Sequence, residues 1–136
     1  METAFQFFST TFNTSVSKDY FINPSCFGYD LAEWLIAKLN ASSIATSAKP
    51  AQEDFGWFFT FCLDGTEYRV VVGFQPNDPA TGDCWIGWVE RQVGFFASIL
   101  GGRKRGVSQD AIAVLDKVLR SSSEIRDLKW CRPEAL

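Results

Sequence analysis

The sequence lacks histidine altogether, although it is 136 residues long. This absence excludes the Ser-His-Asp and Cys-His arrangements of nucleophilic catalysis, together with acid–base catalysis by an imidazole. C-x-x-C pairs, which zinc sites usually contain, are also missing. We therefore expect no metal and no cofactor. Free and mostly buried thiols are the expectation for the four cysteines, Cys26, Cys62, Cys84 and Cys131.

Long apolar runs and an excess of positive charge are missing as well. No run approaches the ~18 apolar residues of a membrane span, and residues 1–12 lack the basic start and cleavage site of a signal peptide. The net charge of −3 weighs against bulk attraction to nucleic acid or anionic lipid. These absences favour a cytoplasmic protein that binds no membrane, and nucleic acid only through a local basic patch.

What the sequence has in excess is aromatic side chains, which make up 15% of the residues as 13 Phe, 5 Trp and 3 Tyr. Each of these side chains can bury about 150–250 Å². No repeat, low-complexity tract or long linker divides the chain. We expect one domain over residues 1–136, with enough apolar area for a core and some left for a partner.

The first part of the chain predicts a strand and a helix. Residues 4–12 are rich in Phe and Thr and alternate as a strand does. Residues 30–40 place apolar side chains at helical spacing, and Asp30 with Glu33 resembles a capping box. Pro50 is expected to break any further regular structure before the next strand.

The strongest local pattern lies in residues 57–75, where two runs of β-forming residues flank Asp64-Gly65. This dipeptide suits the positive φ angles of a type I′ turn, so the segment predicts a hairpin in which Leu63 faces Thr66. Counting back from the turn places Thr60 opposite Arg69 on a mixed, partly wet face. The other face, which we expect to be core, carries Trp57, Phe59, Phe61, Tyr68, Val70 and Val72.

The rest of the chain predicts a third strand over residues 83–90, a helix over residues 108–119 with Ser108 as N-cap, and a short final strand over residues 124–130. The resulting order is β-α-β-β-β-α-β. Consecutive strands with short connections favour an antiparallel sheet with both helices on one face. The expected fold is therefore α+β, a two-layer sandwich with a mainly antiparallel sheet.

Several residues on this framework are candidates for binding. Trp85 and Trp88 fall on opposite faces of the third strand, so one belongs to the core and the other lies beside Arg69. We take Arg69 and Trp85 as the candidates on that face. A half-exposed indole there either anchors a partner or simply covers the sheet.

The acidic residues permit several interpretations. Glu53 and Asp54 form an acidic turn at the hairpin entrance, an interaction site or, less favourably, a catalytic pair. Adjacent residues of a strand point to opposite faces, so these two carboxylates do not converge on one substrate atom. Glu90, which ends the third strand, favours a cross-strand ion pair.

Residues 101–106 form the most function-like loop. Arg103, Lys104 and Arg105 lie in a glycine-framed loop just before a predicted helix N-terminus, which suits a phosphate, a nucleic-acid backbone, an acidic protein surface or merely solvent. The loop has neither P-loop nor G-x-G-x-x-G spacing. The apolar run that precedes it predicts either a short core helix or a flap exposing Phe95 and Phe96 for binding.

Four short motifs together resemble a family of small uncharacterised bacterial proteins. They are Gly28 with D-L-A-x-W-L at residues 30–35, E-D-F-G-W at 53–57, W-I-G-W at 85–88 and G-R-K-R at 102–105. The likeness covers residues 20–130 and implies a bacterial, cytoplasmic origin. Similar compact α+β domains are common among immunity proteins that neutralise bacterial toxins, which is an analogy of fold.

The sequence therefore predicts a protein-binding or inhibitor domain of the immunity type and not an enzyme. A protein partner is expected, and a second copy of the chain is one candidate. The alternative is a nucleic-acid or phospholigand binder that uses Arg103, Lys104 and Arg105. An enzyme based on Glu53, Asp54 or Glu90 ranks below both.

Overall fold

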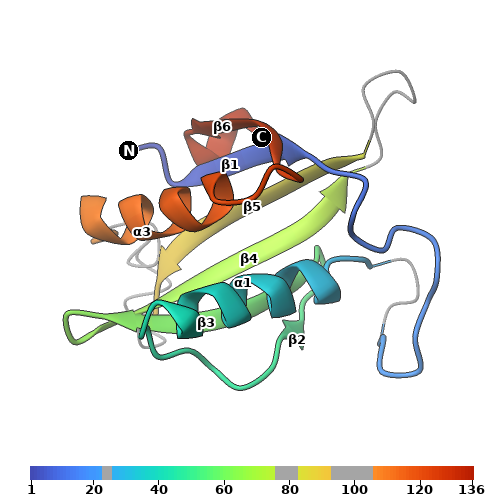
Figure 1. Cartoon of the computed structure of the whole chain (residues 1–136), viewed down its shortest axis with the longest axis horizontal. Coiled ribbons are helices and arrows are strands. Elements are labelled where there is room, and N and C mark those ends of the chain that lie inside the picture. Colours follow the sequence, from blue (N-terminus) through green and yellow to red (C-terminus); the bar gives the residue numbers. More distant parts are fainter. Residues whose placement is uncertain (23–25, 76–82, 93–105) are drawn as a thin grey trace.

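The protein is seen in a computed structural model that describes residues 1–22, 26–75, 83–92 and 106–136. Six antiparallel strands form one sheet in the order β2-β3-β4-β5-β1-β6 (Figure 1). The first strand of the chain thus lies inside the sheet, between β5 and β6. The strands are β1 (Ala4–Phe8), β2 (Ala51–Gln52), β3 (Trp57–Leu63), β4 (Thr66–Gln75), β5 (Cys84–Arg91) and β6 (Arg126–Cys131).

Two helices, α1 (Tyr29–Ala41) and α3 (Gln109–Arg120), lie on the same face of this sheet (Figure 1). A short 3-10 turn, η1 (Pro133–Ala135), follows β6. The predicted α+β fold and the predicted element order are confirmed, apart from the very short β2. Neither helix, in the part of the chain that is described, is long and apolar enough to cross a membrane.

The central hairpin has the register that its turn predicts. Leu63 pairs with Thr66 and Thr60 with Arg69. Asp64 and Gly65 both have positive φ, 50° and 78°, as a type I′ turn requires. A local signal therefore determined which hairpin residues share a face.

The core lies between the sheet and the helices and is largely aromatic on the sheet side. Phe5, Phe7, Phe59, Phe61 and Trp85 are at most 1% exposed. They pack against an aliphatic layer made of Leu31, Leu35 and Leu39 of α1 with Leu115 and Leu119 of α3. The helix α3 begins as predicted, because the Ser108 side chain accepts a hydrogen bond from the Ala111 amide.

The beginnings of the chain and of α1 differ from expectation. β1 ends at Phe8, because Ser9 Oγ accepts a hydrogen bond from the Thr11 amide and turns the chain away. The predicted capping box is wrong. The N-cap of α1 is Gly28, which has no side chain that could accept a hydrogen bond there. Asp30 instead accepts from the Asn13 amide at 2.8 Å and ties the N-terminal loop to the helix.

Regular structure also resumes directly after Pro50, contrary to the prediction. Ala51 pairs with Phe58 and Gln52 with Trp57, so β2 forms an edge strand beside β3. The turn that follows folds back tightly, since the Glu53 amide donates to the Gly56 carbonyl at 2.7 Å. A two-residue strand is too short to leave a periodic signal in the sequence.

Candidate functional site on the open face of the sheet

The face of the sheet opposite the helices, which we call the open face, carries a charged and aromatic cluster. Arg69 lies at its centre, on β4, between Thr60 of β3 and Glu90 of β5. Phe58 and Trp88 lie on the same face, because side chains alternate along each strand. Strand pairing therefore gathers residues from three strands, between positions 58 and 90 of the chain.

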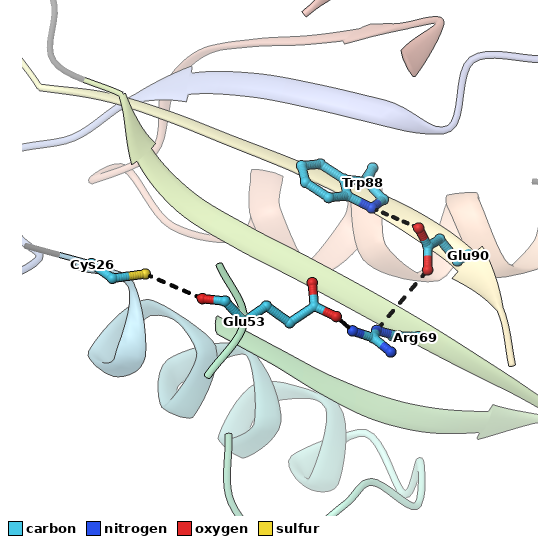
Figure 2. A network of polar contacts seen from close by, with 5 residues as sticks. All are labelled: Cys26, Glu53, Arg69, Trp88 and Glu90. Carbon is cyan, nitrogen blue, oxygen red and sulfur yellow. Dashed lines mark hydrogen bonds and ion pairs between the residues drawn. The ribbon is translucent and has the colours of Figure 1, made fainter. Parts of the chain in front are cut away.

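Two carboxylates hold the Arg69 guanidinium, as Figure 2 shows. Glu53 forms an ion pair with it, and Glu90 Oε2 lies 4.0 Å from Arg69 Nε. The guanidinium carbon lies 3.9 Å from the centre of the Phe58 ring, which is a cation–π distance. All three charged side chains are largely buried, with 11% exposure for Arg69, 24% for Glu53 and 16% for Glu90. The three together carry a net charge of −1.

Glu53 reaches Arg69 because its turn packs flat against β4. A Cβ added to Gly56 would lie 2.0 Å from the Val72 carbonyl oxygen, so only glycine permits this approach. On the other side of the turn, the Cys26 thiol donates to the Glu53 carbonyl at 3.7 Å. The predicted acidic turn is thus real, and its glutamate contributes to the cluster, whereas Asp54 is exposed.

If Trp85 lay on the face of Arg69, as predicted, Trp88 would belong to the core. The structure shows the reverse. Trp85 is fully buried among the core aromatics, and its indole donates to the Ser9 carbonyl at 3.2 Å. The expectation that Trp85 contacts a partner is therefore wrong. Trp88 lies on the open face, where its indole N–H donates to Glu90 Oε1 at 3.0 Å.

Trp88 is the functional candidate that sequence reasoning missed. Alternation already grouped Trp88 with Glu90 and separated both from Trp85. The sequence did not show that Trp88 pairs with Val71 and Glu90 with Arg69. This pairing places Trp88 and Glu90 on the open face. The predicted cross-strand contact of Glu90 is confirmed by the same pairing.

A groove of about 380 Å³ runs along this part of β5. The apolar side chains of Ile86 and Trp88 line it, and Glu90 is the charged side chain among its lining residues. The other described residues that line it are Thr3, Gln75 of β4, Val89 of β5, Pro133 and Leu136. The groove therefore adjoins the Arg69 cluster through Glu90.

The Cys26 thiol, which donates to the Glu53 carbonyl, keeps its proton at neutral pH. Burial raises the pKa of Cys26 above its ordinary value of 9.0, and the negative charge of Asp54 raises it further. A hydrogen bond with the Gln52 side chain lowers this pKa, but by less than burial raises it. A thiol that keeps its proton at neutral pH is a poor nucleophile. All four cysteines are free, with Cys26 and Cys84 buried, Cys131 half-buried and Cys62 exposed.

The structure leaves part of the predicted site outside the described residues. Phe95, Phe96, Arg103, Lys104 and Arg105 all belong to this part of the chain. Within the described ranges, no group of three or more Cys, Asp or Glu residues is arranged to hold a metal ion.

Comparison of the chain with known family models, curated protein sequences and solved structures found no match.

Proposed function

We propose that the chain is a non-enzymatic protein-binding domain that docks its partner on the open face. The observation that carries this proposal is the groove along β5, where apolar side chains adjoin a charge cluster on a face that neither described helix covers. A tryptophan that lines a hollow is typical of the aromatic anchors found at interface hot spots. An inhibitor that neutralises a bacterial toxin is the form of binding that we favour.

The chemistry of the cluster supports binding over catalysis. Glu53 and Glu90 both engage the same guanidinium, and the three charges together leave a net charge of −1. Trp88 fixes the second oxygen of Glu90 through its indole. Such a pre-organised surface loses little side-chain entropy when a partner docks.

Site-specific photo-crosslinking tests the proposal. We would place p-benzoylphenylalanine at Gln75, which is exposed and lines the groove, and at Lys117 of α3 as a control on the helical face. In cells of the organism that encodes the chain, irradiation is expected to yield one adduct of defined mass from position 75 and none from position 117.

The outcomes separate the possible partners. No adduct from position 75, or equal adducts from both positions, would overturn the proposed docking face. An adduct of twice the mass of the chain would identify a second copy as the partner and would overturn the inhibitor form of the proposal.

A further inference from the structure

The groove along β5 has a distinctive combination of shape and charge. Its floor is apolar, made by Ile86 and Trp88, and among the described residues that line it Glu90 is the charged one. A long basic side chain matches such a groove, because its aliphatic stem packs on apolar surface while its charged end pairs with a carboxylate. The net charge of −3 on the chain also favours a basic partner.

The open face already holds one guanidinium in this manner. Arg69 lies over the Phe58 ring at 3.9 Å and pairs with carboxylates. On the neighbouring strand, Trp88 and Glu90 present an aromatic ring and a carboxylate side by side, joined by a 3.0 Å hydrogen bond. In the described part of the chain, no cation lies over the Trp88 ring.

We propose that an arginine side chain of the partner protein occupies this groove, with its guanidinium against Trp88 and paired with Glu90. The inference rests on the proposed protein-binding function and names the chemistry of the partner. Arginine fits better than lysine, because the planar guanidinium stacks on an indole while one of its N–H groups donates to the adjoining carboxylate, an arrangement that a compact ammonium does not match.

A peptide titration tests this inference directly. The probe is the capped tripeptide acetyl-Gly-Arg-Gly-amide, followed through the ¹⁵N-labelled indole resonance of Trp88, whose N–H is bound to Glu90. The matched ligand carries citrulline, which has the shape of arginine without its charge, and a third ligand carries lysine. We expect a saturable shift with arginine, with affinity in the millimolar range, and no shift with citrulline.

Two variants localise the binding. Glu90→Gln keeps the shape and the acceptor oxygen of the side chain and should weaken arginine binding by about tenfold. Glu67→Gln is the control, because Glu67 is exposed on the open face but does not line the groove. It should leave the titration unchanged.

Three results would overturn the inference: an equal shift with citrulline, an unchanged titration in Glu90→Gln, or an equal response to lysine, which would remove the preference for a guanidinium.

The inference and the proposed function fail in different ways. If the crosslinked partner at position 75 binds Glu90→Gln as strongly as the unaltered chain, the docking face stands and the arginine contact does not. If no partner crosslinks at all, the docking face itself is lost.

Discussion

Arg69 is a charged residue in the interior of a sheet, with only 9% of its surface exposed. A guanidinium in such a place is costly unless charges and hydrogen bonds compensate for the water that it loses. Here Glu53, Glu90 and the Phe58 ring surround it. The stability of the open face should therefore depend most on the partner that lies nearest to the guanidinium.

Glu53→Gln should lower the free energy of unfolding by about 1–3 kcal/mol, because a buried guanidinium loses its nearest carboxylate. Glu90→Gln should cost less, since its oxygen lies 4.0 Å away. The control is Arg120→Gln, which breaks the exposed pair with Asp116 on α3 and should cost about 0.5 kcal/mol or less. Urea unfolding measures all three, and a Glu53→Gln cost no greater than that of Arg120→Gln would contradict this account.

At the scale of elements, two glycine turns serve the hairpin in different ways. Gly65 lies in the β3–β4 turn with φ of 78°, and nothing lies within 4 Å of a Cβ added there. Gly56 ends the turn that carries Glu53, and its added Cβ would meet the Val72 backbone. The first glycine is required by its conformation and the second by the contact between two backbones.

Gly65→Ala should therefore cost about 1 kcal/mol of stability, which is the conformational penalty alone. Gly56→Ala should cost more, about 3 kcal/mol, because the turn has to move away from β4 and take Glu53 with it. Urea unfolding gives both values, and the Trp88 indole resonance reports whether the cluster has changed. Equal costs at the two positions would show that the turn does not pack on β4 as described.

Elements also differ in how far the sequence predicts them. The hairpin register and the start of α3 were predictable, because Asp64-Gly65 and Ser108 act through bonds within a few residues. The end of β1, the cap of α1 and the existence of β2 were not. β1 ends at a single side-chain hydrogen bond, from the Thr11 amide to Ser9 Oγ, which leaves no periodic signal. The start of α1 and β2 involve other segments of the chain, through the hydrogen bond from the Asn13 amide to Asp30 and the pairing of β2 with β3.

At the scale of the whole molecule, buried thiols couple folding to alkaline pH. Burial raises the pKa of Cys26 and of Cys84 above the ordinary value of 9.0. Above that pH the unfolded chain releases these protons while the folded chain retains them, so stability falls as pH rises. Partial desolvation together with the charge of Glu33 also raises the pKa of Tyr20 and of Tyr29 above 10.0, which extends the same trend to higher pH.

We expect the free energy of unfolding, measured in urea with a reductant present, to decline between pH 8 and pH 10. A Cys26→Ala, Cys84→Ala double variant should show a shallower decline over this range. Cys62→Ala is the control, because Cys62 is exposed. Identical slopes for the unaltered chain and the double variant would refute the assignment to the buried thiols.

The sequence by itself determined the element order, the hairpin register and the absence of imidazole chemistry, because periodicity, turn residues and composition are local or global properties of the chain. Only the tertiary structure decided that Trp85 is core while Trp88 faces the groove, and that Glu53 meets Arg69. Those outcomes depend on which face the helices cover and on how closely one backbone approaches another. Alternation along a strand separates two faces, but it does not say which of them will be buried.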